Sequence, residues 1–152
     1  MTIQKRHIAG GAAIIALIAA FIAPSEGTRT KAYRDPVGIW TICTGETQGV
    51  YPGQTKTEAE CKAMLADRIP DYLGPVDAMM PGLPNNRRIA YTDFAYNGGV
   101  GMLRKSSIPA LERAGKWREA CAVLKRYIYA GGKVLPGLVK RREKEYQTCL
   151  NG

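Results

Sequence analysis

Two carboxylates are the side chains of this sequence best suited to chemistry. The only histidine, His7, precedes a long apolar run, which excludes Ser/His/Asp and Cys/His arrangements from the rest of the chain. Glu26 and Asp35 stand nine positions apart. Glycoside hydrolysis needs such a pair, because one acid protonates the leaving oxygen while the other acts on water or on the sugar. The spacing alone is common, and each acid taken singly is more often a solvated surface charge.

The residues around these acids resemble the catalytic region of the phage-type lysozymes. That family's pattern is Glu, eight residues, Asp, five residues and Thr, and it falls here on Glu26, Asp35 and Thr41. The resemblance continues to residue 143, through residues 57–62, 94–101, 129–133 and 137–143. With its apolar N-terminal run, the chain is most similar to the signal-arrest-release endolysins of lambdoid phages.

The resemblance implies a role for each site residue. Glu26 would be the general acid, kept protonated by a partly apolar cleft. Asp35 would stay ionised and position water or stabilise the oxocarbenium-like sugar, while the Thr41 hydroxyl orients that water. The implied reaction is hydrolysis of the β-1,4 bond between N-acetylmuramic acid and N-acetylglucosamine, with inversion and without a metal or cofactor. Tyr96 and Asn97 are the expected substrate-binding residues, although such a pair at a helix end is structural at least as often.

One position departs from the family. The residue after Gly45 is commonly His, a structural partner of a carboxylate, and here it is Glu46. The change puts a local ion pair in doubt, and a third carboxylate would raise a neighbour's pKa if it pointed inward. Near the C-terminus, Arg141 and Arg142 are expected to form a solvated or ion-paired face rather than a catalytic one.

The elements that must position these residues follow from periodicity and turn signals. Residues 31–53 alternate β-favouring residues with Gly and Pro, which predicts a small antiparallel sheet. Thr57 to Glu60 has the spacing of a capping box and opens a helix. Further helices are expected at 70–80, 85–97, 107–114, 116–130 and 137–150, with Gly131-Gly132 ending the helix over 116–130. The expected fold is therefore α+β and lysozyme-like: mostly helical with a small antiparallel β-sheet, preceded by an Ala/Gly-rich N-terminal helix.

Four cysteines follow the apolar run, and they indicate an oxidising compartment. An even number beyond an export signal favours two disulfides over free thiols. Zinc is disfavoured because no C-x-x-C pair exists. Three connectivities are open, and we favour the two that join neighbouring elements, Cys43–Cys61 and Cys121–Cys149.

The N-terminal segment is predicted to be a membrane tether. Lys5 and Arg6 precede an uncharged run over residues 8–23, which Pro24 ends. A cleaved signal peptide is the alternative, but cleavage after Ala23 would put Phe21 and Pro24 at unfavourable positions. The run is short and rich in Ala and Gly, so a bilayer would hold it loosely, and a buried core helix is a second possible state. We expect a signal-arrest-release segment over 1–24 and a catalytic domain over 25–152.

Charge indicates the class of partner. Lys and Arg total 22 against 13 Asp and Glu, a net charge of +9 that favours an anionic partner. Nucleic acid is disfavoured because zinc spacings, RNA-binding signatures and phosphate loops are absent. We expect peptidoglycan as substrate, the host inner membrane as partner through residues 8–23, and a phage holin as an indirect partner, with release into the periplasm. The rival readings are a lytic transglycosylase and a membrane-anchored, non-catalytic peptidoglycan-binding protein.

Overall fold

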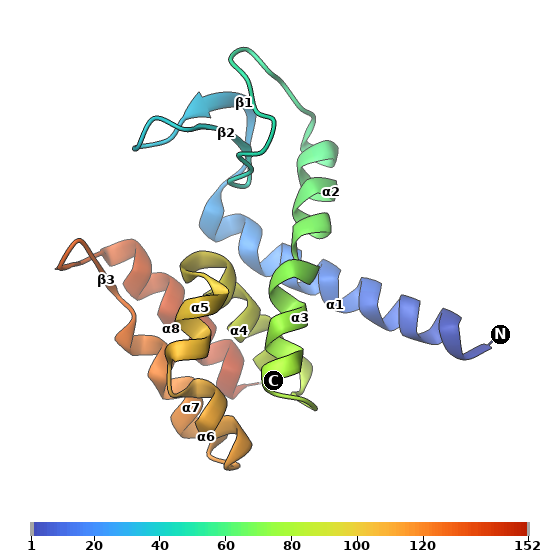
Figure 1. The fold of residues 1–152 in the computed structure, drawn as a ribbon, viewed down its shortest axis with the longest axis vertical. Coiled ribbons are helices and arrows are strands. Elements are labelled where there is room, and N and C mark those ends of the chain that lie inside the picture. Colours follow the sequence, from blue (N-terminus) through green and yellow to red (C-terminus); the bar gives the residue numbers. More distant parts are fainter. Residues whose placement is uncertain (1, 152) are drawn as a thin grey trace. The chain divides into compact units, whose positions relative to one another are not determined.

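The computed structural model describes the backbone of residues 2–151 and the side chains of residues 11–151. The chain forms two compact units, Met1–Pro70 (unit 1) and Asp71–Gly152 (unit 2). In Figure 1 unit 1 runs from blue to green and unit 2 from green to red. Each unit combines helices with one two-stranded antiparallel sheet, which confirms the mostly helical α+β prediction.

Unit 1 begins with a long helix that includes the apolar run. Helix α1 (Thr2–Glu26) continues through Pro24, and Gly27, with φ 72°, follows its last residue in the left-handed conformation typical of a helix C-terminus. Ile14, Ile18 and Ile22 are buried at intervals of four, so they share one face of the helix. The run is thus a helix with a buried face in this structure. No helix among the described residues has both the length and the apolar character needed to cross a membrane.

The predicted sheet of unit 1 is a hairpin with an irregular first strand. Strand β1 (Arg29–Arg34) pairs with β2 (Trp40–Cys43), Arg29 lying opposite Cys43 and Tyr33 opposite Thr41. From Arg29 to Tyr33 the chain advances four residues along β1, while the partners Cys43 and Thr41 are only two residues apart along β2, so β1 contains a bulge or irregularity. Such an irregularity bends a strand and redirects the residues beyond it. Residues 54–56 bond to the other edge of β1, through Ala32 N to Gln54 O and Lys56 N to Thr30 O.

Helix α2 (Glu58–Arg68) completes unit 1 and packs against α1. The predicted cap is present, because the Thr57 hydroxyl accepts a hydrogen bond from Glu60 N at 3.1 Å. A disulfide joins Cys43, at the end of β2, to Cys61 in the first turn of α2. The two cysteines belong to a small core with Ala32 and Ile42.

Unit 2 is helical around one apolar core. Helices α4 and α8 lie side by side in it, and Tyr91, Phe94, Leu103 and Ile108 are among its fully buried residues (Figure 1). The elements are α3 (Pro70–Met79), α4 (Asn85–Gly98), α5 (Val100–Lys105), α6 (Ile108–Arg113), α7 (Trp117–Val123), the 3-10 helix η1 (Leu124–Arg126), β3 (Tyr129–Ala130), β4 (Lys133–Val134) and α8 (Pro136–Leu150).

Two features of unit 2 differ from the sequence prediction. The helix expected over 116–130 ends at Arg126, and Tyr129–Ala130 instead pairs with Lys133–Val134 in a hairpin. Gly131 and Gly132, which we expected to end the helix, both have positive φ and form the turn of that hairpin. Helix α5 was not predicted, because six residues are too few to show a helical period.

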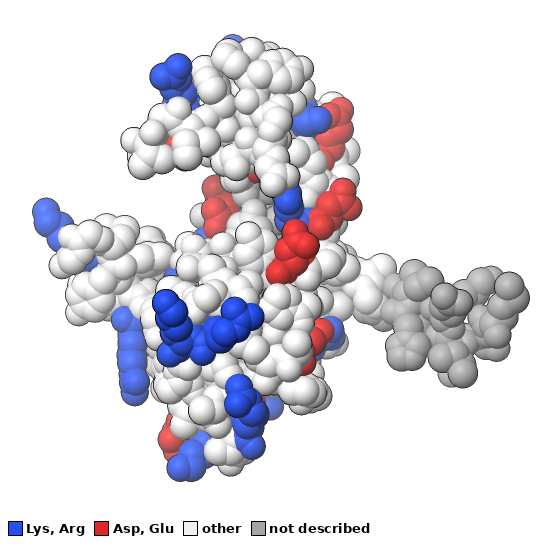
Figure 2. Space-filling view, viewed as in Figure 1, with Lys and Arg blue, Asp and Glu red and all other residues white. Residues whose placement is uncertain are grey.

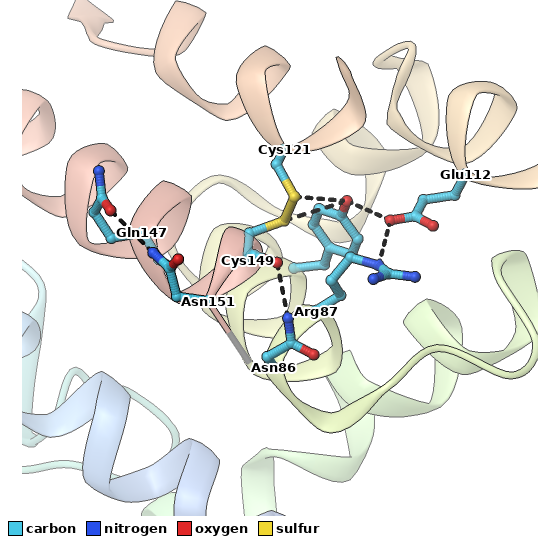
Figure 3. Close-up of a disulfide and its surroundings, with 8 residues drawn as sticks. Asn86, Arg87, Glu112, Cys121, Gln147, Cys149 and Asn151 are labelled. Atoms are coloured by element: carbon cyan, nitrogen blue, oxygen red, sulfur yellow. Dashed lines mark hydrogen bonds and ion pairs between the residues drawn. A yellow bond between two sulfur atoms is a disulfide. The ribbon is translucent and has the colours of Figure 1, made fainter. Parts of the chain in front are cut away.

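The second disulfide lies in the core of unit 2. Cys121 of α7 is joined to Cys149 of α8, so both favoured pairings are present. The Tyr91 hydroxyl lies 3.5 Å from Cys149 Sγ and donates a hydrogen bond to Glu112 Oε1 at 2.7 Å. Figure 3 shows the disulfide and Glu112. Burial, and then the hydrogen bond to Glu112, raises the pKa of Tyr91, so the phenol keeps its proton and remains a donor.

The position of this disulfide generates a stability prediction. Replacing Cys121 and Cys149 together by alanine should lower the free energy of unfolding by about 2–5 kcal/mol, because the open chain gains entropy when the link is removed. Urea unfolding of the parent and the double variant, followed by circular dichroism, measures the difference. Equal urea midpoints with equal slopes would contradict it.

Candidate active site

Glu26 is the last residue of α1 and is exposed. Gly27 N donates to Ala23 O at 2.9 Å, so the helical bonding extends to this end of the helix. The first residue of β1, Arg29, follows three positions later. The position of the Glu26 carboxylate therefore depends on how α1 is packed. The partly apolar surroundings expected for it stay a prediction.

Asp35 is held by the turn between β1 and β2. Its Oδ1 accepts hydrogen bonds from Val37 N at 3.0 Å and Ile39 N at 2.8 Å, and its own N–H donates to Ile39 O at 2.9 Å. An aspartate that bonds its own turn in this way stabilises the chain reversal. Both bonds to the Asp35 side chain that the described residues provide fall on Oδ1.

Thr41 lies on β2 and is buried, at 4% exposure. Its hydroxyl donates to Ile39 O at 3.0 Å. The backbone of Ile39 therefore contacts both side chains, since its N–H bonds Asp35 and its carbonyl bonds Thr41. Because the Thr41 proton is committed to that carbonyl, Oγ1 retains its capacity to accept a hydrogen bond from a third group.

Glu46 forms an ion pair. The expectation that a local ion pair is lost when Glu46 stands in place of the family's histidine is therefore wrong. Arg68 donates to both Glu46 oxygens, from Nε at 2.7 Å and from Nη2 at 2.7 Å, and it also donates to Gln48 Oε1. The Arg68 bonds hold the pKa of the Glu46 carboxyl below its usual range. Its charge is thus directed at a cation rather than added to the carboxylate pair.

This ion pair links β2 to α2. Glu46 exchanges two backbone hydrogen bonds with Ile42, the neighbour of Thr41, while Arg68 ends α2. The Cys43–Cys61 disulfide joins the same two elements one residue further along β2. One ionic and one covalent link therefore fix the strand that carries Thr41. Sequence reasoning missed Arg68, because a partner 22 positions away leaves no local pattern.

Tyr96 and Asn97 belong to unit 2, at the end of α4, whereas Glu26, Asp35 and Thr41 belong to unit 1. The Tyr96 ring packs against Tyr72, with ring centroids 5.0 Å apart. Asn97 Oδ1 accepts a short hydrogen bond from Arg142. Both residues thus have structural contacts within their unit, and their role in substrate binding stays a prediction.

Arg141 and Arg142 are buried and ion-paired. Of the two predictions for these residues, a solvated face was wrong and an ion-paired face is confirmed. Arg141 donates to both oxygens of Asp93, at 2.9 and 2.8 Å, and Arg142 donates to Glu145 Oε1 at 2.6 Å. Burial, and then the neighbouring Asp93, raises the pKa of the Glu145 carboxyl. These charges join α8 to α4 and act in the stability of unit 2.

An acid at the end of α1 and a second acid with a hydroxyl on the following hairpin are the group types that glycoside hydrolysis uses. Comparison with known proteins gives the family. Residues 23–145 match the Phage lysozyme family, and the chain belongs to it. It is 40% identical to the SAR-endolysin of bacteriophage PS119, over 84% of this chain and 77% of that protein. It is 37% identical to the SAR-endolysin of Enterobacteria phage P21, over 95% of this chain and 92% of that protein.

Solved structures agree with this assignment. The active form of the P1 phage endolysin is similar with a TM-score of 0.81 at 30% identity, covering 93% of this chain and 94% of that one. The secreted inactive form of the same endolysin matches with a TM-score of 0.53, covering 69% of this chain and 76% of that one. The lysozyme-like fold expected from sequence is confirmed.

The Glu46–Arg68 pair generates a prediction with a defined pH dependence. Glu46→Gln should lower the free energy of unfolding by about 1 kcal/mol at pH 7, because a bidentate charged contact is lost. The folded-state pKa of Glu46 is lowered, so its stabilisation is present above its unfolded pKa and is lost as the pH falls through the folded value. The difference between parent and variant should therefore shrink below pH 4.5. Urea unfolding at several pH values measures it.

The matched control is Glu60→Gln. That acid lies on α2 and contacts Lys56 only at 3.7 Å on an exposed surface. Its loss should change the unfolding free energy by less than about 0.5 kcal/mol. Equal stability losses for the Glu46 and Glu60 variants at pH 7 would remove the special role of the Arg68 pair.

Proposed function

We propose that this phage lysozyme is an endolysin that cleaves host peptidoglycan at the β-1,4 bond between N-acetylmuramic acid and N-acetylglucosamine. The observation that carries the proposal is the turn at Ile39, which holds Asp35 and Thr41 on one backbone unit of the hairpin that follows Glu26. The SAR-endolysin names of relatives that cover most of the chain support the same activity.

Each side chain has a part in the proposed reaction. Glu26 protonates the glycosidic oxygen as it leaves. Asp35 Oδ1 is occupied by two backbone N–H groups, so its second oxygen takes a proton from water or faces the oxocarbenium-like sugar. Thr41 Oγ1 accepts a hydrogen bond from that water, since its own proton is donated to Ile39 O. Attack by this water from the opposite side of the sugar gives inversion.

The two rival readings differ in what they release. A lytic transglycosylase would need no water activated by Asp35 and would release 1,6-anhydro sugars. A membrane-anchored, non-catalytic binding protein would release no muropeptides at all. Asp35 and Thr41 sharing Ile39 favours hydrolysis, because this geometry suits an oriented water.

Substitution of the acids tests the enzyme. Glu26→Gln and Asp35→Asn should each lower the rate of turbidity clearing of outer-membrane-permeabilised cells by about 100- to 10,000-fold, since each removes a proton-transfer or charge-stabilising group. Glu58→Gln, at the exposed start of α2, is the matched control and should clear normally. Mass spectrometry of the parent's products should show reducing muropeptides. Either 1,6-anhydro products or full activity of the Glu26 variant would refute the hydrolytic assignment.

The proposal includes a tether over residues 1–24 that keeps the enzyme inactive at the inner membrane until release into the periplasm. Supporting it, Ile14, Ile18 and Ile22 form a buried face of α1, and Glu26 ends the same helix. When these side chains lie in lipid they are unavailable to the protein, and the position of Glu26 changes with them. The higher TM-score to the active than to the inactive P1 endolysin suits the reading that the packed helix is the released state.

The membrane potential provides the control. On release, the α-amine, Lys5 and Arg6 must cross outward against an inside-negative field. Each charge costs about 2.3 kcal/mol per 100 mV, so the three together cost about 7 kcal/mol. Depolarisation by a phage holin removes this cost, and the loosely held Ala-rich run can then leave the bilayer.

Release can be followed directly. The full-length protein is placed in the membrane of spheroplasts or proteoliposomes in a single orientation, and the membrane is then depolarised. Depolarisation should move the protein from the membrane to the soluble fraction and start lysis. Replacing Lys5 and Arg6 by glutamine should allow release at a higher remaining potential, because fewer charges oppose it. Membrane association and lytic activity that do not respond to depolarisation would exclude this model while leaving the glycosidase intact.

A further inference from the structure

The hairpin of unit 2, residues 129–134, exposes apolar side chains together with the start of α8. Tyr129 is 62% exposed, Val134 47%, Leu135 41% and Val139 42%. These four are the large hydrophobic residues of unit 2 that are exposed among the described residues. A contiguous patch of exposed apolar residues marks an interaction site, whereas isolated exposed apolar residues are ordinary.

The geometry of the hairpin puts two of these side chains together. Tyr129 is the register partner of Val134, and Ala130 that of Lys133. Directly opposed residues of an antiparallel pair project from the same face. Tyr129 and Val134 therefore form one small apolar platform, while Lys133 projects from the other face of the two-stranded ribbon.

The hairpin is rigidly supported at both ends. Leu135 N donates to Ile128 O at 3.0 Å, which extends the pairing beyond Tyr129. Before the hairpin, Tyr127 packs edge-on against Phe94 at 5.0 Å, and its carbonyl accepts from Arg142 Nε. After it, α8 is fixed to α4 by the buried Arg141–Asp93 pair. A platform held in this way loses little conformational entropy when it binds a ligand.

The surroundings of the platform are cationic. The sequence contains no acidic residue between Glu119 and Glu143. Arg126, Lys133 and Lys140 are exposed within that interval, and the ion pairs given for the described residues include none of the three. The projecting hairpin of Figure 1 carries Lys or Arg atoms at its tip in the space-filling view (Figure 2). The favoured ligand therefore combines apolar surface with carboxylates.

We infer that the hairpin and the first two turns of α8 bind a peptide-bearing glycan strand of peptidoglycan. Tyr129 packs on a sugar face, while Lys133, from the opposite face of the ribbon, and Lys140 pair with carboxylates of the stem peptides that extend from the glycan. The inference rests on the proposed function, which it extends to a second contact on unit 2. An anionic membrane surface is the other ligand with this chemistry, and the experiment below separates the two.

Binding is measured in a Glu26→Gln background, so that sacculi are not digested. Tyr129→Ala should raise the Kd for purified sacculi about tenfold, the effect of losing a binding hot spot. Tyr129→Phe keeps the ring and should bind like the parent. Lys133→Gln should weaken binding to intact sacculi about threefold, in the range of an exposed ion pair. That variant should bind normally to glycan strands from which an amidase has removed the stem peptides.

The matched control is Tyr51→Ala in unit 1, a tyrosine of similar exposure at 59%, which should leave the Kd unchanged. Thermal unfolding confirms that each variant is folded. Unchanged sacculus binding by Tyr129→Ala, or an equal loss in the Tyr51 variant, overturns the inference. So does loss of binding to anionic phosphatidylglycerol vesicles without loss on sacculi, which assigns the hairpin to the membrane. Muropeptide release by the parent is assayed separately, so failure of the proposed function is distinguishable.

Discussion

Burial of one face of α1 is the interaction that fixes the end of this helix and, with it, the position of Glu26. Ile14, Ile18 and Ile22 each contribute about 1.5–3 kcal/mol when removed from water. Under the proposed function, a bilayer takes up the same three side chains before release, and protein and membrane compete for one apolar face. Nine of the sixteen residues of the run over 8–23 are Ala or Gly, which add little apolar area in lipid. In the proposed mechanism this composition keeps the two states close in free energy, so that the membrane potential decides between them.

The proposed catalytic groups differ in how far they depend on this packing. Asp35 and Thr41 are organised locally, through hydrogen bonds to Ile39 within a single turn. The disulfide and the Glu46–Arg68 pair fix that hairpin to α2 independently of the apolar face of α1. Glu26 is the last residue of α1, so its position follows the packing of that helix. Under the proposed function, control of one acid is enough to control the enzyme, and the hairpin can stay assembled throughout.

The parts of this structure that sequence predicted are those with local signals. The spacing of Thr57 and Glu60 predicted the start of α2, and the turn residues between 31 and 53 predicted the first hairpin. The end of η1 was missed because Gly131-Gly132 serves equally as a helix stop and as a hairpin turn. Choosing between them depended on tertiary contacts, in particular Arg142 bonding the Tyr127 carbonyl. The Arg68–Glu46 and Arg141–Asp93 ion pairs could not be predicted from sequence for the same reason, because each joins elements far apart in the chain.

The distribution of charge connects the two units to one kind of ligand. Arginine neutralises acids in both units, with Arg68 on Glu46, Arg88 on Asp77 and Arg141 on Asp93. The cations used in this way are mostly buried or half-buried, so they contribute to folding rather than to long-range attraction. The remaining excess of lysine and arginine lies on the surface, where it concentrates an anionic polymer near the protein. That attraction is not selective, and selectivity must come from groups with fixed geometry. The Ile39 turn in unit 1 and the supported hairpin in unit 2 are two such groups, because each is rigid before any ligand binds.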